Sequence, residues 1–271
     1  MGQRTIVAAI LTPLAVAVIY FGGVYYTGVI VLLLAIAAWE YCLLLKKVDL
    51  QPWTALVLGG VILLGLIRGF YQFNYLAFIF TVLIFGAAFF HIVQFERGDT
   101  RPAVDFGGSL SALFYIGFLG PYLISLRGLP DGMWWTFLVL PTVWIADTGA
   151  YLIGSAFGKY KLAPKTSPNK TWEGYFAGVI TGTLGSLGLL GLYNGVFNAG
   201  LTLSPLEASL LGLAISVFIP LGDLTESFIK RQAGEKDSGR IFPGHGGVFD
   251  RLDSLFWAAP IGYYLILNLF Q

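Results

Sequence analysis

The sequence predicts an all-α integral membrane protein, a polytopic bundle of about nine transmembrane helices with a polar cavity facing the cytoplasm. Composition is the first observation, because the 271 residues are 56% hydrophobic and only 11% charged. Their mean hydropathy of +0.76 is well above that of soluble chains. The second observation is length: the apolar residues fall into stretches of about 20, which cross a bilayer as helices. A membrane barrel would instead show short alternating strands.

Nine apolar stretches are predicted to span the membrane, and all of them belong to one membrane domain covering residues 1–271. In chain order they are 5–22, 24–45, 53–69, 74–94, 108–126, 133–157, 174–194, 205–230 and 251–270.

Positive charges set the expected orientation of these spans. With the N-terminus in the cytoplasm, 14 of the 16 Lys and Arg residues lie on the cytoplasmic side, and only Arg68 and Arg127 lie outside. The three sizeable polar loops, 95–107, 158–173 and 231–250, are then all cytoplasmic. A formal net charge of +1 gives no basic field of the kind that binds nucleic acid. A single cysteine excludes an intramolecular disulfide.

Three acidic residues lie inside predicted spans: Asp147 in the sixth, and Asp223 and Glu226 in the eighth. A charged side chain at membrane depth costs roughly 3 kcal/mol, so such residues are usually paired or functional. Glu226 shares a helix face with Asp223 and also with Lys230, so an internal salt bridge to Lys230 is one interpretation. Asp147 and Asp223 have no cationic neighbour in the sequence, which favours a bound metal ion.

Pro220 and Gly222 precede Asp223 in the eighth span. Proline removes a backbone donor, and a helix that breaks near polar groups is a common way to open a site at membrane depth. An ordinary kink is the alternative interpretation.

The stretch "HGGVFDRLD" leads into the last predicted span and carries Asp250 and Asp253, which are spaced to share a helix face. An acidic first turn suits the helix dipole, but capping alone explains only one of the two carboxylates. Glycines at this turn let backbone N–H groups approach a phosphate closely. His245 is a candidate ligand, proton carrier or hydrogen-bond donor to a phosphate, with a cap of the turn as the alternative.

The loop 158–173 combines four lysines with hydroxyl and amide side chains. Taken by itself, it also fits an ordinary solvated loop on the positively charged side. Together with the acidic residues it supplies what phosphoryl or nucleotidyl transfer requires: carboxylates for Mg²⁺, and lysines for the remaining phosphate charge. No G-x-S-x-G elbow and no Walker P-loop occurs in the sequence.

The segment "SFIKRQAGEKDSGRIFPGHGGVFDRLD", from Ser227 to Asp253, resembles the signature of the CDP-diacylglycerol synthases, the phosphatidate cytidylyltransferases. That signature is Ser-x-x-Lys-Arg, four residues, Lys-Asp, then His-Gly-Gly and Asp-Arg-x-Asp, and this chain matches every fixed element. The strings "ADTGAY" and "PKTSPNKTWEG" resemble the family too. Residues 131–271 are therefore expected to be the catalytic half, and residues 1–130, which match only in general character, a scaffold and dimerisation half.

The resemblance implies transfer of the cytidylyl group of CTP to phosphatidic acid, with Mg²⁺, a second cation such as K⁺, a homodimer and the bacterial inner membrane. Metal ligation carries over best to Asp223 and Asp250, with Asp253, Asp147 and Glu226 placed around them. The expected catalytic residues are Asp223, Asp250, Lys230, Asp253 and Lys170. The expected substrate-binding residues are Lys165, Asn169, Arg231, Lys236, Asp237, His245, Gly246, Gly247 and Arg251.

Two other functions fit parts of this pattern. The CDP-alcohol phosphatidyltransferases also use aspartates on lipid substrates, but their Asp-Gly-x-x-Ala-Arg core does not occur here. A cation-coupled transporter would use the acidic residues within the spans as an ion path. It would need polar groups at both membrane faces, whereas only two of the Lys and Arg residues are predicted to lie on the outer side.

Overall fold

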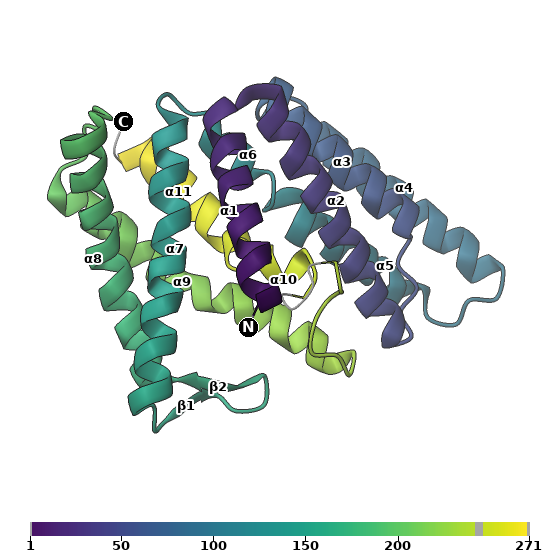
Figure 1. The fold of residues 1–271 in the computed structure, drawn as a ribbon. Coiled ribbons are helices and arrows are strands. Elements are labelled where there is room, and N and C mark those ends of the chain that lie inside the picture. The colour runs from purple at the N-terminus through teal and green to yellow at the C-terminus, as the bar shows by residue number, and fades with distance from the viewer. Residues whose placement is uncertain (1, 242–245, 270–271) are drawn as a thin grey trace. The chain divides into compact units, whose positions relative to one another are not determined.

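The computed structural model describes residues 2–241 and 246–269, and this part of the chain is almost entirely helical, as predicted (Figure 1). The elements in chain order are α1 (Gly2–Phe21), α2 (Gly23–Lys47), α3 (Thr54–Tyr71), α4 (Leu76–Glu96), α5 (Pro102–Ala112), the π-helical segment η1 (Leu113–Phe118), α6 (Tyr122–Arg127), α7 (Gly132–Phe157), β1 (Lys161–Ala163), β2 (Ser167–Thr171), α8 (Trp172–Phe197), α9 (Pro205–Gln232), α10 (Phe249–Leu252) and α11 (Leu255–Leu269).

Seven helical segments among the described residues are long and apolar enough to cross a membrane. They are α2, α3, α4, the run Pro102–Arg127, α7, α8 and α9, and they coincide with the second to eighth predicted spans. Within the first predicted span the apolar helix is Leu11–Phe21, and within the ninth α11 has 15 residues. The prediction of a helical membrane bundle is confirmed, whereas the number nine and the cytoplasmic N-terminus stay predictions.

The chain divides into two compact units. Unit 1 comprises the described residues of Met1–Ser125 and Ile229–Leu252. Its helices α2, α3 and α4 lie side by side (Figure 1). Small residues on α3 bring α2 close: a Cβ added to Gly65 would lie 2.7 Å from the Val31 side chain. Arg68, also on α3, is buried within the unit, with its guanidinium 3.5 Å from the ring centroid of Phe73.

Unit 2 comprises the described residues of Leu126–Phe228 and Asp253–Gln271. Helices α7 and α8 pack along their length, and the hairpin of β1 and β2 extends from one end of this pair (Figure 1). Gly182 of α8 contacts both Ala146 of α7 and Ser216 of α9, where a Cβ would collide with the serine side chain. The three long helices can therefore approach one another closely.

Three local features differ from what the sequence suggested. The predicted polar loop 158–173 contains an antiparallel β-hairpin, and its end is tied to α8 because Thr171 Oγ1 accepts the Gly174 N–H at 3.2 Å. Helix α9 continues through Pro220, so the interpretation of Pro220 as a helix break is wrong and the ordinary kink stays the alternative; membrane helices tolerate proline when neighbouring groups compensate for the lost donor.

The last predicted span, 251–270, is not one continuous helix. Helical structure begins earlier, at Phe249, and is interrupted between α10 and α11. The N–H of Ser254 donates to Asp253 Oδ1 at 2.7 Å, so a short acidic side chain takes a backbone donor that a continuous helix would use.

Candidate active site

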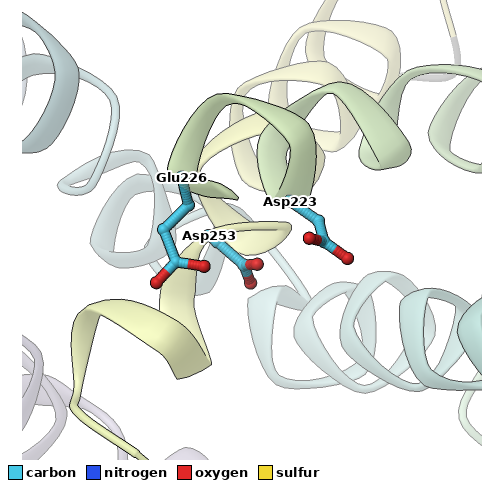
Figure 2. Close-up of side chains that lie close together, drawn as sticks. All are labelled: Asp223, Glu226 and Asp253. Atoms are coloured by element: carbon cyan, nitrogen blue, oxygen red, sulfur yellow. The ribbon is translucent and has the colours of Figure 1, made fainter. Parts of the chain in front are cut away.

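Helix α9 carries the first two acidic residues of the candidate site. Asp223 and Glu226 lie one turn apart on this helix, and Asp253 approaches them from the turn after α10 (Figure 2). One carboxylate oxygen from each of the three lies within 4.8 Å of the others. We call these three residues the acidic cluster, and all of them belong to unit 2. The predicted shared face of Asp223 and Glu226 therefore receives a third carboxylate from 27 residues further along the chain.

A glycine makes this approach possible. Gly222 is buried on α9, and a Cβ added to it would collide with the backbone carbonyl of Asp253. The sequence reading assigned Gly222 to a helix break. Its place in the structure is a close contact between α9 and the turn that carries Asp253.

The β-hairpin contributes a cation to the same unit. Lys170 Nζ, on β2, lies 2.7 Å from Asp223 Oδ2. The Ser227 hydroxyl donates to Asp223 Oδ1 at 3.1 Å, so each oxygen of this carboxylate has a partner. Asp147 on α7 is exposed and interacts electrostatically with both Lys170 and Asp223. The three predicted residues Asp147, Lys170 and Asp223 are thus close neighbours.

Asp250 lies in a different environment, within unit 1. Its Oδ1 is 2.5 Å from Lys230 Nζ, and both side chains are largely buried. Its Oδ2 accepts three hydrogen bonds of 2.8 Å each, from the Ser238 N–H, the Ser238 hydroxyl and the Gly247 N–H. Asp250 therefore holds Lys230 and two points of the signature segment together, whereas the sequence suggested mainly a metal ligand.

Gly246 and Gly247 lie close around Asp250, and the predicted approach of this turn to a phosphate stays a prediction. Gly246 has a φ of +82°, which favours glycine. A Cβ on it would also lie 2.6 Å from Asp250 Oδ2. His245 lies outside the described residues.

Glu40 is a site residue that the sequence analysis missed. It is 1% exposed, on α2 of unit 1. Its Oε2 accepts the Ser238 hydroxyl at 3.0 Å and the Phe249 N–H at 2.8 Å. The sequence does mark Glu40, because it is a charged residue within an apolar span, as Asp147 is. Its partners lie about 200 residues away in the chain, so no local spacing pointed to them.

The other predicted substrate-binding residues are accessible from solvent. This set comprises the hairpin residues Lys165 and Asn169 and the residues Arg231, Lys236, Asp237 and Arg251 of the signature region, all of which are exposed. Their exposure is compatible with contact to a water-soluble substrate, and their roles stay predictions.

Comparison with known proteins gives a consistent result. A model of the cytidylyltransferase family matches residues 2–269. A phosphatidate cytidylyltransferase of Brucella suis biovar 1 is 34% identical over 270 residues, which cover 96% of this chain and 91% of that protein. The protein of the same name from Synechocystis is 32% identical, with 98% and 97% covered. That of Bacillus subtilis is 41% identical over 156 residues, 57% of this chain and 56% of its own.

Proposed function

The chain belongs to the cytidylyltransferase family, and we propose that it transfers the cytidylyl group of CTP to phosphatidate, giving CDP-diacylglycerol and pyrophosphate. It is an enzyme, a nucleotidyltransferase embedded in a membrane. The proposed mechanism is based on the acidic cluster and the neighbouring Lys170. Carboxylates can bind a metal ion and a lysine can neutralise negative charge, and both stabilise reacting phosphates.

The acidic cluster fits a magnesium ion. Mg²⁺ prefers oxygen ligands and uses carboxylates together with substrate phosphates, and three carboxylate oxygens lie within 4.8 Å of one another here. Asp223, Glu226 and Asp253 would hold the ion. When bound, it would neutralise and orient phosphate oxygens of CTP. The family resemblance adds Asp250 and Asp147 as ligands and K⁺ as a second cation, and we keep these as part of the proposal.

The chain's own residues then have separable tasks. The phosphate of phosphatidate is already a nucleophile, so its oxygen attacks the α-phosphorus of CTP in line without a strong general base. We assign to Lys170 and Lys230 the negative charge that develops on pyrophosphate. Each is held by a carboxylate, Lys170 by Asp223 and Lys230 by Asp250.

The proposed location is the bacterial inner membrane, with the active site facing the cytoplasm, where CTP is made. The 14-to-2 division of Lys and Arg supports this orientation. After Cys42→Ser, a cysteine placed at Ser167 should react with a membrane-impermeant thiol reagent only in inside-out vesicles. Labelling of intact cells from outside would reverse the orientation.

A homodimer is also part of the proposal, and it rests on the resemblance alone. Light scattering of the purified protein, corrected for bound detergent, should give twice the mass of the 271-residue chain. A monomer that remains fully active would remove the dimer from the account.

Pyrophosphate release by the purified protein tests the reaction itself. We expect release only when CTP and phosphatidate are both present, with the other nucleoside triphosphates giving little. Exhaustive chelation should abolish the activity, and added Mg²⁺ should restore it. Pyrophosphate release without phosphatidate would contradict the proposed transfer, and full activity after chelation would contradict the metal.

A further inference from the structure

Unit 1 contains a cavity of about 720 Å³ where α2 ends. One wall is formed by the last turns of α2, from Trp39 to Lys47, and the other by the segment 235–241. Because α2 is a membrane-spanning helix that ends with two lysines, this end lies where hydrocarbon gives way to lipid headgroups.

The cavity is rich in cations. Lys46, Lys236 and Arg240 line it, are exposed, and form no ion pair with another described residue. The fourth cation, Lys47, lies 2.5 Å from Glu235 Oε1. The hydrogen bond from Lys47, together with its charge, lowers the pKa of Glu235, so this pair persists at neutral pH.

Two of the three carboxylates that line the cavity already have partners. Glu235 pairs with Lys47, and Glu40 accepts hydrogen bonds from Ser238 and Phe249. Asp237 is the third and is exposed. Four cations and three carboxylates thus line the cavity, and Arg240 also helps to lower the pKa of Glu235. Lys46, Lys236 and Arg240 are in no ion pair with another described residue and can turn to an anion. Arginine in particular binds a phosphate through two parallel N–H groups.

The rest of the cavity is apolar and open. Trp39 is 46% exposed, Leu43 is 37% exposed and Ile241 is 44% exposed. Trp39, Leu43 and Lys46 follow one another at helical spacing, so apolar side chains and then a cation lie in order along one face of α2. A ligand that matches this order has a hydrocarbon part and an anionic end.

The wall formed by 235–241 is fixed in place. Glu40 binds the Ser238 hydroxyl at 3.0 Å, and it lies so close to Gly239 that a Cβ there would collide with its carboxylate. The cavity is therefore preformed, which lowers the entropy cost of binding.

We propose that this cavity binds phosphatidate, with the phosphate among Lys46, Lys236 and Arg240 and an acyl chain along Trp39 and Leu43. The inference rests on the proposed function and specifies where its lipid substrate is held. A phosphate monoester carries about −1.5 to −2 charges at neutral pH, which suits three cations. CTP would match the cations equally well but would leave the apolar wall uncovered, so the lipid is the better occupant.

Steady-state kinetics of Lys46→Gln and Arg240→Gln test this assignment. Each removes one charge-assisted contact, so we expect KM for phosphatidate to rise about tenfold while KM for CTP and kcat stay within about twofold. Arg97→Gln is the matched control, since Arg97 is exposed in unit 1 but does not line the cavity. A rise in KM for CTP instead, or unchanged KM values for both substrates, would overturn the proposal.

A binding measurement without turnover separates this inference from the reaction. Phosphatidylcholine vesicles that contain brominated phosphatidate should quench the tryptophan fluorescence of the protein. Trp39→Phe should lose the part of this quenching that exceeds the quenching by brominated phosphatidylcholine, because Trp144 and Trp172 are also exposed. Brominated phosphatidylcholine in place of phosphatidate should give little difference between the two proteins. Equal quenching of Trp39 by both lipids would refute specific binding in the cavity, even in an enzyme that makes CDP-diacylglycerol. An inactive enzyme that still shows specific quenching would instead refute the reaction.

Discussion

Asp250 and Asp253 are three residues apart in the chain, yet the structure places them in different chemical settings. Asp250 is 8% exposed and is surrounded by donors: an ammonium group, a hydroxyl and two backbone N–H groups. Asp253 is half-buried and shares its surroundings with two further carboxylates, Asp223 and Glu226. A buried carboxylate among donors stabilises the fold by being charged, whereas neighbouring carboxylates repel one another. In the acidic cluster Lys170 offsets part of this repulsion at Asp223, and a bound cation would offset more.

The difference separates two contributions to the same proposed reaction. The setting of Asp250 orders the signature segment and positions Lys230. The acidic cluster provides oxygen ligands for a metal ion. Substitutions that remove one negative charge should therefore act on different measured quantities in the two places, which the following predictions exploit.

The largest effect is expected for Asp223→Asn. This change keeps the shape of the side chain but removes the charge that faces Lys170 and one ligand of the cluster. We expect turnover to fall by at least ~100-fold, and the stabilisation of the fold by Mg²⁺ to disappear. Turnover and melting temperature, each with and without Mg²⁺, provide the check. Near-native turnover would show that the cluster is not the metal site.

A smaller effect is expected for Lys170→Gln. The Lys170–Asp223 pair is partly exposed, so it contributes only about 0–1 kcal/mol to stability. Its charge matters more in the transition state, and we expect kcat to fall roughly tenfold or more. Lys161→Gln, an exposed lysine on the other strand of the hairpin, is the control. If kcat fell equally in both variants, Lys170 would contribute only to the overall positive charge of the hairpin and not to a specific contact.

Glu40 should affect stability more than chemistry. Glu40→Ala leaves the buried Phe249 N–H without its acceptor, which costs about 1–3 kcal/mol, while the Ser238 hydroxyl can still donate to Asp250. Glu40→Gln retains an acceptor oxygen and should recover most of that loss. Urea or thermal unfolding of both variants measures the difference. If both variants lost the same stability, the charge of Glu40 and not its hydrogen bonds would be responsible.

Hydropathy predicted the membrane helices well because a bilayer imposes their length, and helix periodicity correctly joined Asp223 to Glu226. The different surroundings of Asp250 and Asp253 could not be predicted from the sequence. A spacing of three suggests a shared face only if the helix is continuous, and the Ser254 N–H bonded to Asp253 interrupts it. The roles of Glu40 and Gly222 depend on contacts between distant segments, which no local pattern encodes. The hairpin was missed because its strands are short and rich in lysine and proline.

The melting temperatures of Asp250→Asn and Asp253→Asn, measured side by side in metal-free buffer, test the contrast between the two settings most directly. Asp250→Asn leaves the buried Lys230 ammonium facing a neutral amide, so the account predicts a loss of roughly 3 kcal/mol, or about 5–10 °C. Asp253→Asn removes one of three neighbouring negative charges and keeps an oxygen that can accept the Ser254 N–H, so it should lose clearly less stability than Asp250→Asn. Equal losses in the two variants, or a loss confined to Asp253→Asn, would contradict the account.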